Sequence, residues 1–95
     1  MTIEKKQDGA KLTLIPIGRI DTLTAPDLEA VVVTDGLEEL VFDLAQVDYI
    51  SSAGLRVLLG AQKKMVGKVM KIANPQPAVK EVFDITGFSD IFTFV

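Results

Sequence analysis

The sequence of 95 residues contains no cysteine, no histidine and no tryptophan. Without cysteine the chain has no thiol nucleophile and no disulfide, and without histidine it lacks the commonest general base. Both absences together remove the usual ligands of zinc. Most hydrolase and redox mechanisms therefore lack their reagents, and we expect neither a catalytic centre nor a metal or cofactor site.

Long apolar runs are also missing, and no uninterrupted apolar stretch reaches the length of a membrane span. The N-terminal segment MTIEKKQDGAK has no apolar core of the kind that a signal peptide requires. We therefore expect a cytoplasmic protein.

A concentrated basic face is absent as well. The chain has 10 lysines and arginines against 13 acidic residues, for a net charge of −3. The basic residues are scattered, apart from the pairs Lys5-Lys6 and Lys63-Lys64, so nucleic-acid binding is disfavoured. With 48% hydrophobic residues the composition is typical of a globular protein, and the length suits a single domain over residues 1–95.

The first part of the chain is predicted to form a β-hairpin within residues 3–20. Asp8-Gly9 is a favoured hairpin turn. Leu12, Leu14 and Ile17 indicate one buried face of the second strand.

The first helix is expected from about Ala25 to Val33, and it looks short because its last residues are β-branched. Thr24 is suited to cap the helix, Pro26 to occupy its first turn, and Asp27 to favour the positive end of its dipole.

The remaining pattern predicts two more helices and several strands. Residues 45–51 are expected to form a loop between a strand and a helix. Leu55, Leu58, Leu59 and Met65 show helical spacing in the second helix, as do Val79, Val82, Phe83 and Ile85 in the third. The expected elements are a strand at Leu37–Leu44, a helix at Ser52–Met65, a strand at Val69–Ala73, a helix opened by Asn74-Pro75-Gln76-Pro77 and stopped by Gly87, and a strand at Ile91–Val95. Strands that alternate with helices after a hairpin predict an α/β fold, a mixed β-sheet of about four to five strands with helices packed mainly on one face.

Two adjacent serines, Ser51 and Ser52, stand at the predicted start of the second helix. Serine is a favoured N-cap, because its hydroxyl satisfies a free backbone N–H, so either serine can simply cap the helix. A phosphoryl group at the same place would meet free N–H donors and the positive end of the helix dipole. It would add about −1.5 to −2 charges at neutral pH and change the surface without unfolding the chain.

The residues that follow the serines suit a docking face. Gly54 costs roughly 1 kcal/mol of helix propensity relative to alanine, which indicates close approach of another chain or, alternatively, packing within this one. Val57 lies off the apolar stripe beside Arg56, so an apolar side chain is expected to be partly exposed next to a positive one.

Three segments resemble the STAS family, named for sulfate transporters and anti-sigma factor antagonists. GRID followed by Thr24-Ala25 is similar to the pattern ahead of the family's first helix. Residues 41–59 are similar to its core signature, a strand ending in Asp-Leu, a serine-containing loop and Gly-Leu. VKEVFDITGF, residues 79–88, resembles its last helix and Thr-Gly stop. The resemblance covers almost the whole chain and implies a STAS-like fold.

The resemblance also implies a function. In the family's anti-sigma factor antagonists, the serine two residues before the glycine, here Ser52, is phosphorylated by the anti-sigma factor. That partner is a serine kinase of GHKL type, and phosphoserine blocks its binding until a serine phosphatase removes the phosphate. Kinase-regulated members usually have aspartate where this chain has Ser51, which makes Ser51 an alternative acceptor. Asp21 matches a family acidic residue near the phosphorylation site, or it serves only as a turn or capping residue. The residues expected to bind the partner are Asp21, Thr22, Ser51, Ser52, Ala53, Gly54, Arg56 and Val57.

The sequence leaves two other classes of function to compare with this one. A STAS adaptor that is not phosphorylated, serving a transport or sensory assembly, is favoured by the missing aspartate at position 51. An enzyme would have to use carboxylates such as Asp21, Asp43 and Asp48, but the last two are more simply explained as strand-end and turn residues. No nucleophile and base pair and no phosphate-binding glycine loop is visible, so any nucleotide is expected to belong to the partner.

Overall fold

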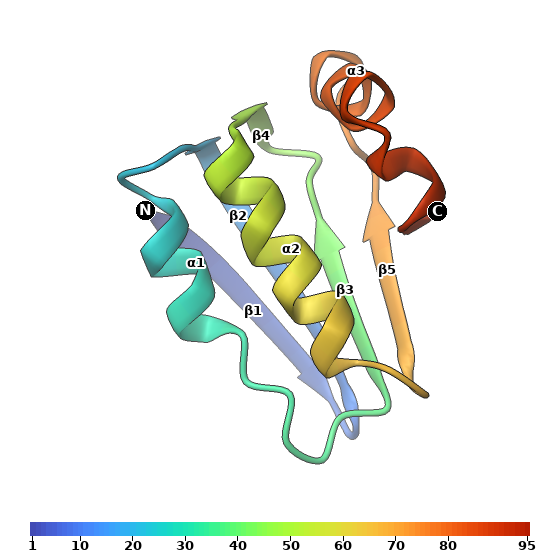
Figure 1. Cartoon of the computed structure of the whole chain (residues 1–95). Coiled ribbons are helices and arrows are strands. Elements are labelled where there is room, and N and C mark those ends of the chain that lie inside the picture. The colour runs from blue at the N-terminus through green and yellow to red at the C-terminus, as the bar shows by residue number, and fades with distance from the viewer.

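The computed structural model describes residues 1–95 as a mixed sheet with helices (Figure 1). The strands are β1 (Thr2–Asp8), β2 (Lys11–Ile20), β3 (Glu39–Asp43), β4 (Val47–Ile50), β5 (Val69–Ala73) and β6 (Thr93–Phe94). The helices are α1 (Ala25–Val31), α2 (Ser52–Lys64) and α3 (Pro77–Thr86), and a 3₁₀ turn, η1, covers Phe88–Asp90.

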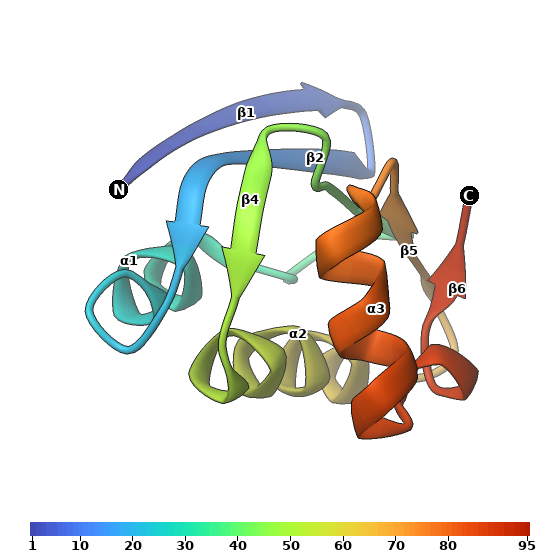
Figure 2. The same cartoon turned by 90° about the horizontal axis from the view of Figure 1, so that it is seen from above.

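The sheet has the order β1-β2-β3-β5-β6, and β4 pairs with the end of β2. Only β1 is antiparallel to its neighbour, and the other pairs are parallel. Figure 2 shows α1 and α2 beneath the same face of this sheet, with α3 beside β4. The predicted α/β class, the mixed sheet and the one-sided helices are therefore confirmed.

The strand β4 was missed, because residues 45–51 were expected to form a loop. Its burial does not alternate: Val47 and Ile50 are buried, whereas Asp48 and Tyr49 between them are exposed. The strand exists because it pairs in parallel with β2, after a shift of register between Gly18 and Arg19. That pairing depends on residues far away in the sequence, and it brings the sheet to six strands.

The expected buried face of β2 was partly wrong. Leu12 and Leu14 belong to the core under the helices, but Ile17 is only half-buried. Successive side chains of a strand point to opposite faces, so Ile17 lies with Ile15 on the face of the sheet that carries no helix.

Backbone conformation at single residues ends helices α1 and α3. Helix α1 stops two residues before the expected Val33, because Val32 already has a non-helical backbone. Helix α3 stops at Gly87, whose φ of 79° is the left-handed conformation that favours glycine.

Ile85 was expected on the apolar stripe of α3, but it is 76% exposed, because it lies across the helix from Val79 and Phe83. The last strand is shorter than the expected 91–95, since η1 uses the residues ahead of it.

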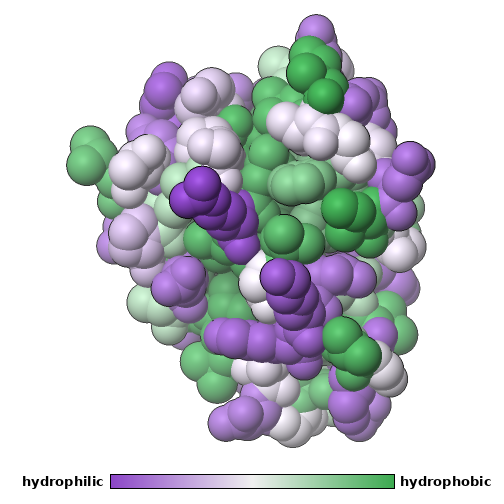
Figure 3. Space-filling model, in the orientation of Figure 1, coloured by the Kyte–Doolittle hydropathy of each residue, from purple (hydrophilic) through white to green (hydrophobic).

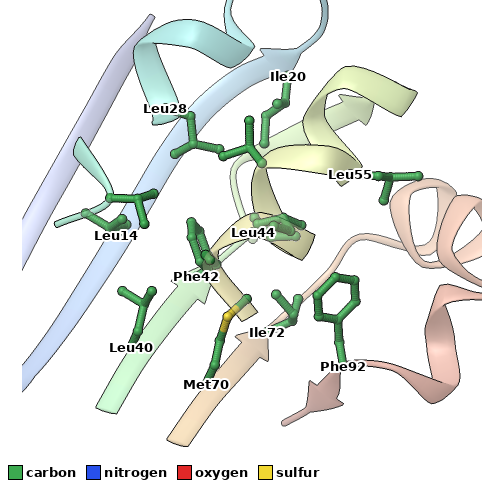
Figure 4. Packing of buried hydrophobic residues seen from close by; sticks show 14 of the residues in the cluster. Leu14, Ile20, Leu28, Leu40, Phe42, Leu44, Leu55, Met70, Ile72 and Phe92 are labelled. Carbon is green, nitrogen blue, oxygen red and sulfur yellow. The ribbon is translucent and has the colours of Figure 1, made fainter. Parts of the chain in front are cut away.

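The core lies between the sheet and the helices (Figure 4). It contains 22 buried residues, and no charged or polar side chain is buried in the chain. The largest fully buried side chains are those of Phe42, Phe83, Leu14, Ile20, Leu28, Leu40, Leu44, Ile50, Leu58, Ile72, Val47 and Val79. None of the helices combines the length and the apolar character that a membrane crossing needs.

Candidate functional site

The parallel pairing of β2 and β4 brings the two predicted site segments together. Ile20 and Ile50 are partners in the register, and the Ser51 N–H donates a hydrogen bond to the Ile20 carbonyl over 2.8 Å. The loop 21–24 follows one strand and the two serines follow the other. Both segments therefore lie at the same edge of the sheet, above α1 and α2 in Figure 1.

The loop 21–24 is held by a compact set of hydrogen bonds around Asp21. Its carboxylate oxygen Oδ1 accepts from the N–H groups of Leu23 at 3.0 Å and Thr24 at 3.1 Å. The Thr24 hydroxyl accepts from the Asp21 N–H at 2.8 Å and donates to the Arg19 carbonyl at 2.8 Å. The loop thus has a defined shape ahead of any partner.

Thr24 does not cap α1 as predicted. It occupies the N-cap position, but its side chain makes no capping bond to the helix. The reason is that its hydroxyl is already engaged with Asp21 and Arg19. The turn reading of Asp21 is confirmed by the same bonds.

The hydrogen bonds to Asp21 also favour its charged form. The Thr24 N–H, followed by the Leu23 N–H and the side chains of Thr24 and Arg19, lowers the pKa of Asp21 below the ordinary aspartate value, against the opposing effect of desolvation.

A depressed folded-state pKa gives a defined pH dependence. The stabilisation by the Asp21 carboxylate is complete above the ordinary aspartate pKa of about 3.9 and is lost as the pH falls through the lower folded value. We expect the free energy of unfolding of the wild type to fall more steeply between pH 5 and pH 2 than that of Asp21→Asn, measured by urea denaturation. Parallel curves for the two proteins would contradict this assignment.

The two serines have different surroundings. Ser51 is half-buried at the N-cap of α2, with an extended backbone, and its Oγ accepts a hydrogen bond from the Gly54 N–H at 3.4 Å. Ser52 is the first residue of the helix and is exposed, and its hydroxyl makes no hydrogen bond within the chain. Ser51 is therefore the serine that caps the helix, whereas the Ser52 hydroxyl remains accessible.

Gly54 is explained by packing within the chain. A Cβ at this position would lie 2.6 Å from Cγ2 of Ile20 and 2.8 Å from Cγ1 of Ile50. Helix α2 therefore approaches the ends of β2 and β4 so closely that only hydrogen fits. The alternative of close approach by another chain is not needed, and Gly54 is buried rather than part of the exposed surface.

Val57 was expected to be partly exposed, and this was wrong, because only 7% of it is accessible. Helix α1 packs beside α2 and covers that side of it. Arg56 is exposed, as expected. A hollow of about 210 Å³ lies between the two helices, lined by Thr22, Ala25, Pro26, Glu29, Ala53, Arg56 and Val57.

The predicted partner-binding residues thus fall into three groups by exposure. Thr22, Ser52 and Arg56 are exposed. Those that are half-buried are Asp21, Ser51 and Ala53. The buried ones, Gly54 and Val57, can only position the others.

Three exposed residues beside the site were missed from the sequence. Leu23 is 86% exposed at the tip of the rigid loop 21–24. Figure 3 shows the face of the molecule that carries α1 and α2, where apolar and hydrophilic surface are interspersed. The Arg19 guanidinium lies 4.5 Å from the centre of the Tyr49 ring, and its Nε is 3.5 Å from Oδ2 of Asp21. A leucine between two threonines in a turn was the only available signal, because the Arg19–Tyr49 contact depends on the missed strand.

Asp43 and Asp48, two of the carboxylates considered for catalysis, have simple local settings. Asp43 accepts a hydrogen bond from the Ala45 N–H at 3.1 Å, which is the turn role expected for it. Asp48 is exposed on β4. No cluster of three acidic side chains is placed so that it could hold a metal ion.

The sequence profile of the STAS domain family matches residues 2–95. The chain therefore belongs to the STAS domain family, as the three segments of its sequence indicated.

The relatives within the family are regulators by name. BtrV of Bordetella bronchiseptica, provisionally named an anti-sigma factor antagonist, is 39% identical over 92 residues, covering 92% of this chain and 78% of BtrV. The anti-sigma-B factor antagonist of Listeria monocytogenes is 33% identical over 93 residues, covering 92% and 81% of the two chains. An anti-sigma factor antagonist from Mycobacterium paratuberculosis has a crystal structure that matches with a TM-score of 0.89 at 27% identity, covering 98% and 83%.

Proposed function

We propose that this chain is an anti-sigma factor antagonist that works in the cytoplasm and is switched off by phosphorylation of Ser52. In the unphosphorylated state it binds an anti-sigma factor that is a serine kinase of GHKL type, and so releases the sigma factor. A serine phosphatase restores the active state. The observation that carries the proposal is the exposed Ser52 hydroxyl at the start of α2, beside the rigid loop 21–24.

Ser52 is the better acceptor because Ser51 is already engaged. The Ser51 hydroxyl satisfies the Gly54 N–H at the helix start, and phosphorylating it would disturb the cap. This also accounts for a serine where related antagonists usually have aspartate, since both residues are good N-caps.

A phosphate on Ser52 is compatible with the fold. The first turn of α2 contains no acidic residue that would repel it. Free N–H groups and the positive end of the helix dipole favour an anion at this place. The phosphate would therefore leave the fold intact and place about −1.5 to −2 charges on the docking surface.

The switch is tested with the anti-sigma factor kinases of the organism's own genome, purified individually and supplied with Mg²⁺ and ATP. We expect the wild type and Ser51→Ala to gain the mass of one phosphate, and Ser52→Ala to gain none. Phosphorylated wild type should lose the kinase complex in a gel-filtration assay. Ser51→Ala is the matched control, because it loses the cap and about 1 kcal/mol of stability but keeps the acceptor.

The other candidate is a STAS adaptor that is never phosphorylated, which the serine at position 51 favours. A complex with the kinase that forms without any gain of mass would establish the adaptor. Phosphate on Ser51 alone would overturn the choice of residue while leaving the switch in place.

A further inference from the structure

Arg56 is an exposed cation that no acidic group of the chain neutralises. It lies on α2, and none of the ion pairs within 4 Å includes it. Glu29 of α1 lines the same hollow without forming an ion pair with Arg56, and Asp21 of the loop is paired with Arg19. An unpaired arginine beside the proposed docking surface is free to bind an external carboxylate or a new anion.

Ser52 and Arg56 stand at positions i and i+4 of the same helix, and both are exposed. Side chains with this spacing are neighbours on one face, about 5–6 Å apart at their Cβ atoms. The order is the favourable one, with the anion nearer the N-terminus and the cation one turn later. The guanidinium fork matches the oxygens of a phosphate, so a phosphoserine at position 52 has a ready partner.

We propose that Arg56 changes its binding partner when Ser52 is phosphorylated. In the unphosphorylated protein, Arg56 binds a carboxylate of the anti-sigma factor. In the phosphorylated protein, its guanidinium pairs with the phosphate on Ser52 and is withdrawn from that carboxylate. Phosphorylation then acts twice, by adding negative charge and by removing the positive charge on which the partner depends. This inference rests on the proposed phosphorylation of Ser52.

The first experiment needs no kinase. Phosphoserine is introduced at position 52 during synthesis, and its second pKa is measured by ³¹P NMR in the wild type and in Arg56→Gln. We expect this pKa to be lower in the wild type by about 0.3, because the pair favours the dianion, and the gap to close in 1 M NaCl. Arg56→Lys should lie between the two, since it keeps the charge but not the fork.

Lys63→Gln is the matched control, because Lys63 is an exposed cation on the same helix, remote from Ser52 and in no ion pair. In Lys63→Gln, the second pKa of the phosphoserine should equal that of the wild type. Equal phosphoserine pKa values in wild type and Arg56→Gln would overturn the inference.

The second experiment separates this inference from the proposed function. Unphosphorylated Arg56→Gln should bind the anti-sigma factor kinase about 5-fold more weakly than the wild type at low salt, and the difference should shrink at high salt. Equal binding by the two proteins would overturn the claim that Arg56 binds a carboxylate of the partner, while the antagonist function would stand. If the wild type binds no kinase, the proposed function fails, and the phosphoserine titration still decides whether Arg56 pairs with the phosphate.

Discussion

Phe83→Ala is expected to lower the free energy of unfolding by about 4 kcal/mol, the largest effect of any substitution discussed for this chain. The Phe83 side chain is fully buried on α3. Its ring meets Phe92 edge-on at 5.7 Å between centroids and Phe94 at 5.2 Å. Removing the ring leaves a cavity in the core and loses the edge-on contacts with Phe92 and Phe94. Urea denaturation followed by circular dichroism measures the change.

Ile85→Ala is the matched control for this prediction. Ile85 lies two positions further along the same helix but is 76% exposed, so its truncation should change the stability by no more than about 0.5 kcal/mol. A comparable loss in both variants would show that the burial of Phe83 in the aromatic cluster is not the cause of the effect.

Leu23→Asp is expected to weaken binding to the anti-sigma factor by at least about 30-fold, which corresponds to about 2 kcal/mol. The Asp21 and Thr24 hydrogen bonds fix the loop, so the exposed leucine is presented without further ordering cost. An apolar side chain offered in this way fits an apolar pocket of the partner, where a carboxylate would be buried without compensation. Isothermal titration calorimetry with the purified kinase gives the affinity.

The matched control for Leu23 is Val66→Asp. Val66 is 80% exposed after the far end of α2, away from the serines. It should bind as the wild type does, and both variants should keep the wild-type thermal stability, since neither side chain is buried. Unchanged affinity of Leu23→Asp would remove the loop tip from the docking surface.

Much of the candidate site was predictable because it is local. Ser51 caps α2 through a bond to a residue three positions later, and Asp21 closes a turn onto Leu23 and Thr24. Such bonds join near neighbours, so residue types and their spacing reveal them. Thr24 failed as a cap because its hydroxyl bonds to the Asp21 N–H and the Arg19 carbonyl and not to the helix, and the sequence gives no rule for that choice.

The exposure of single side chains was predicted less well. Val57 looked exposed because it lies off the stripe of its own helix, yet α1 packs beside it. Ile85 was grouped with the apolar residues of the third helix, yet it is 76% exposed on α3. Helical periodicity describes one face of one helix, and a second helix arriving from elsewhere changes which positions are covered.

By itself the sequence determined the α/β class, the alternation of strands and helices, the starts of α2 and α3 and the stop at Gly87, since these follow from periodicity, caps and turns within a few residues. Only the tertiary structure decided that residues 47–50 form a strand, that Gly54 must be glycine, and that loop 21–24 stands beside the two serines. All three depend on the parallel pairing of β2 with β4, at Ile20 and Ile50. Parallel strands have no short turn to join them, so their pairing leaves no local signal and forms only when the whole chain packs.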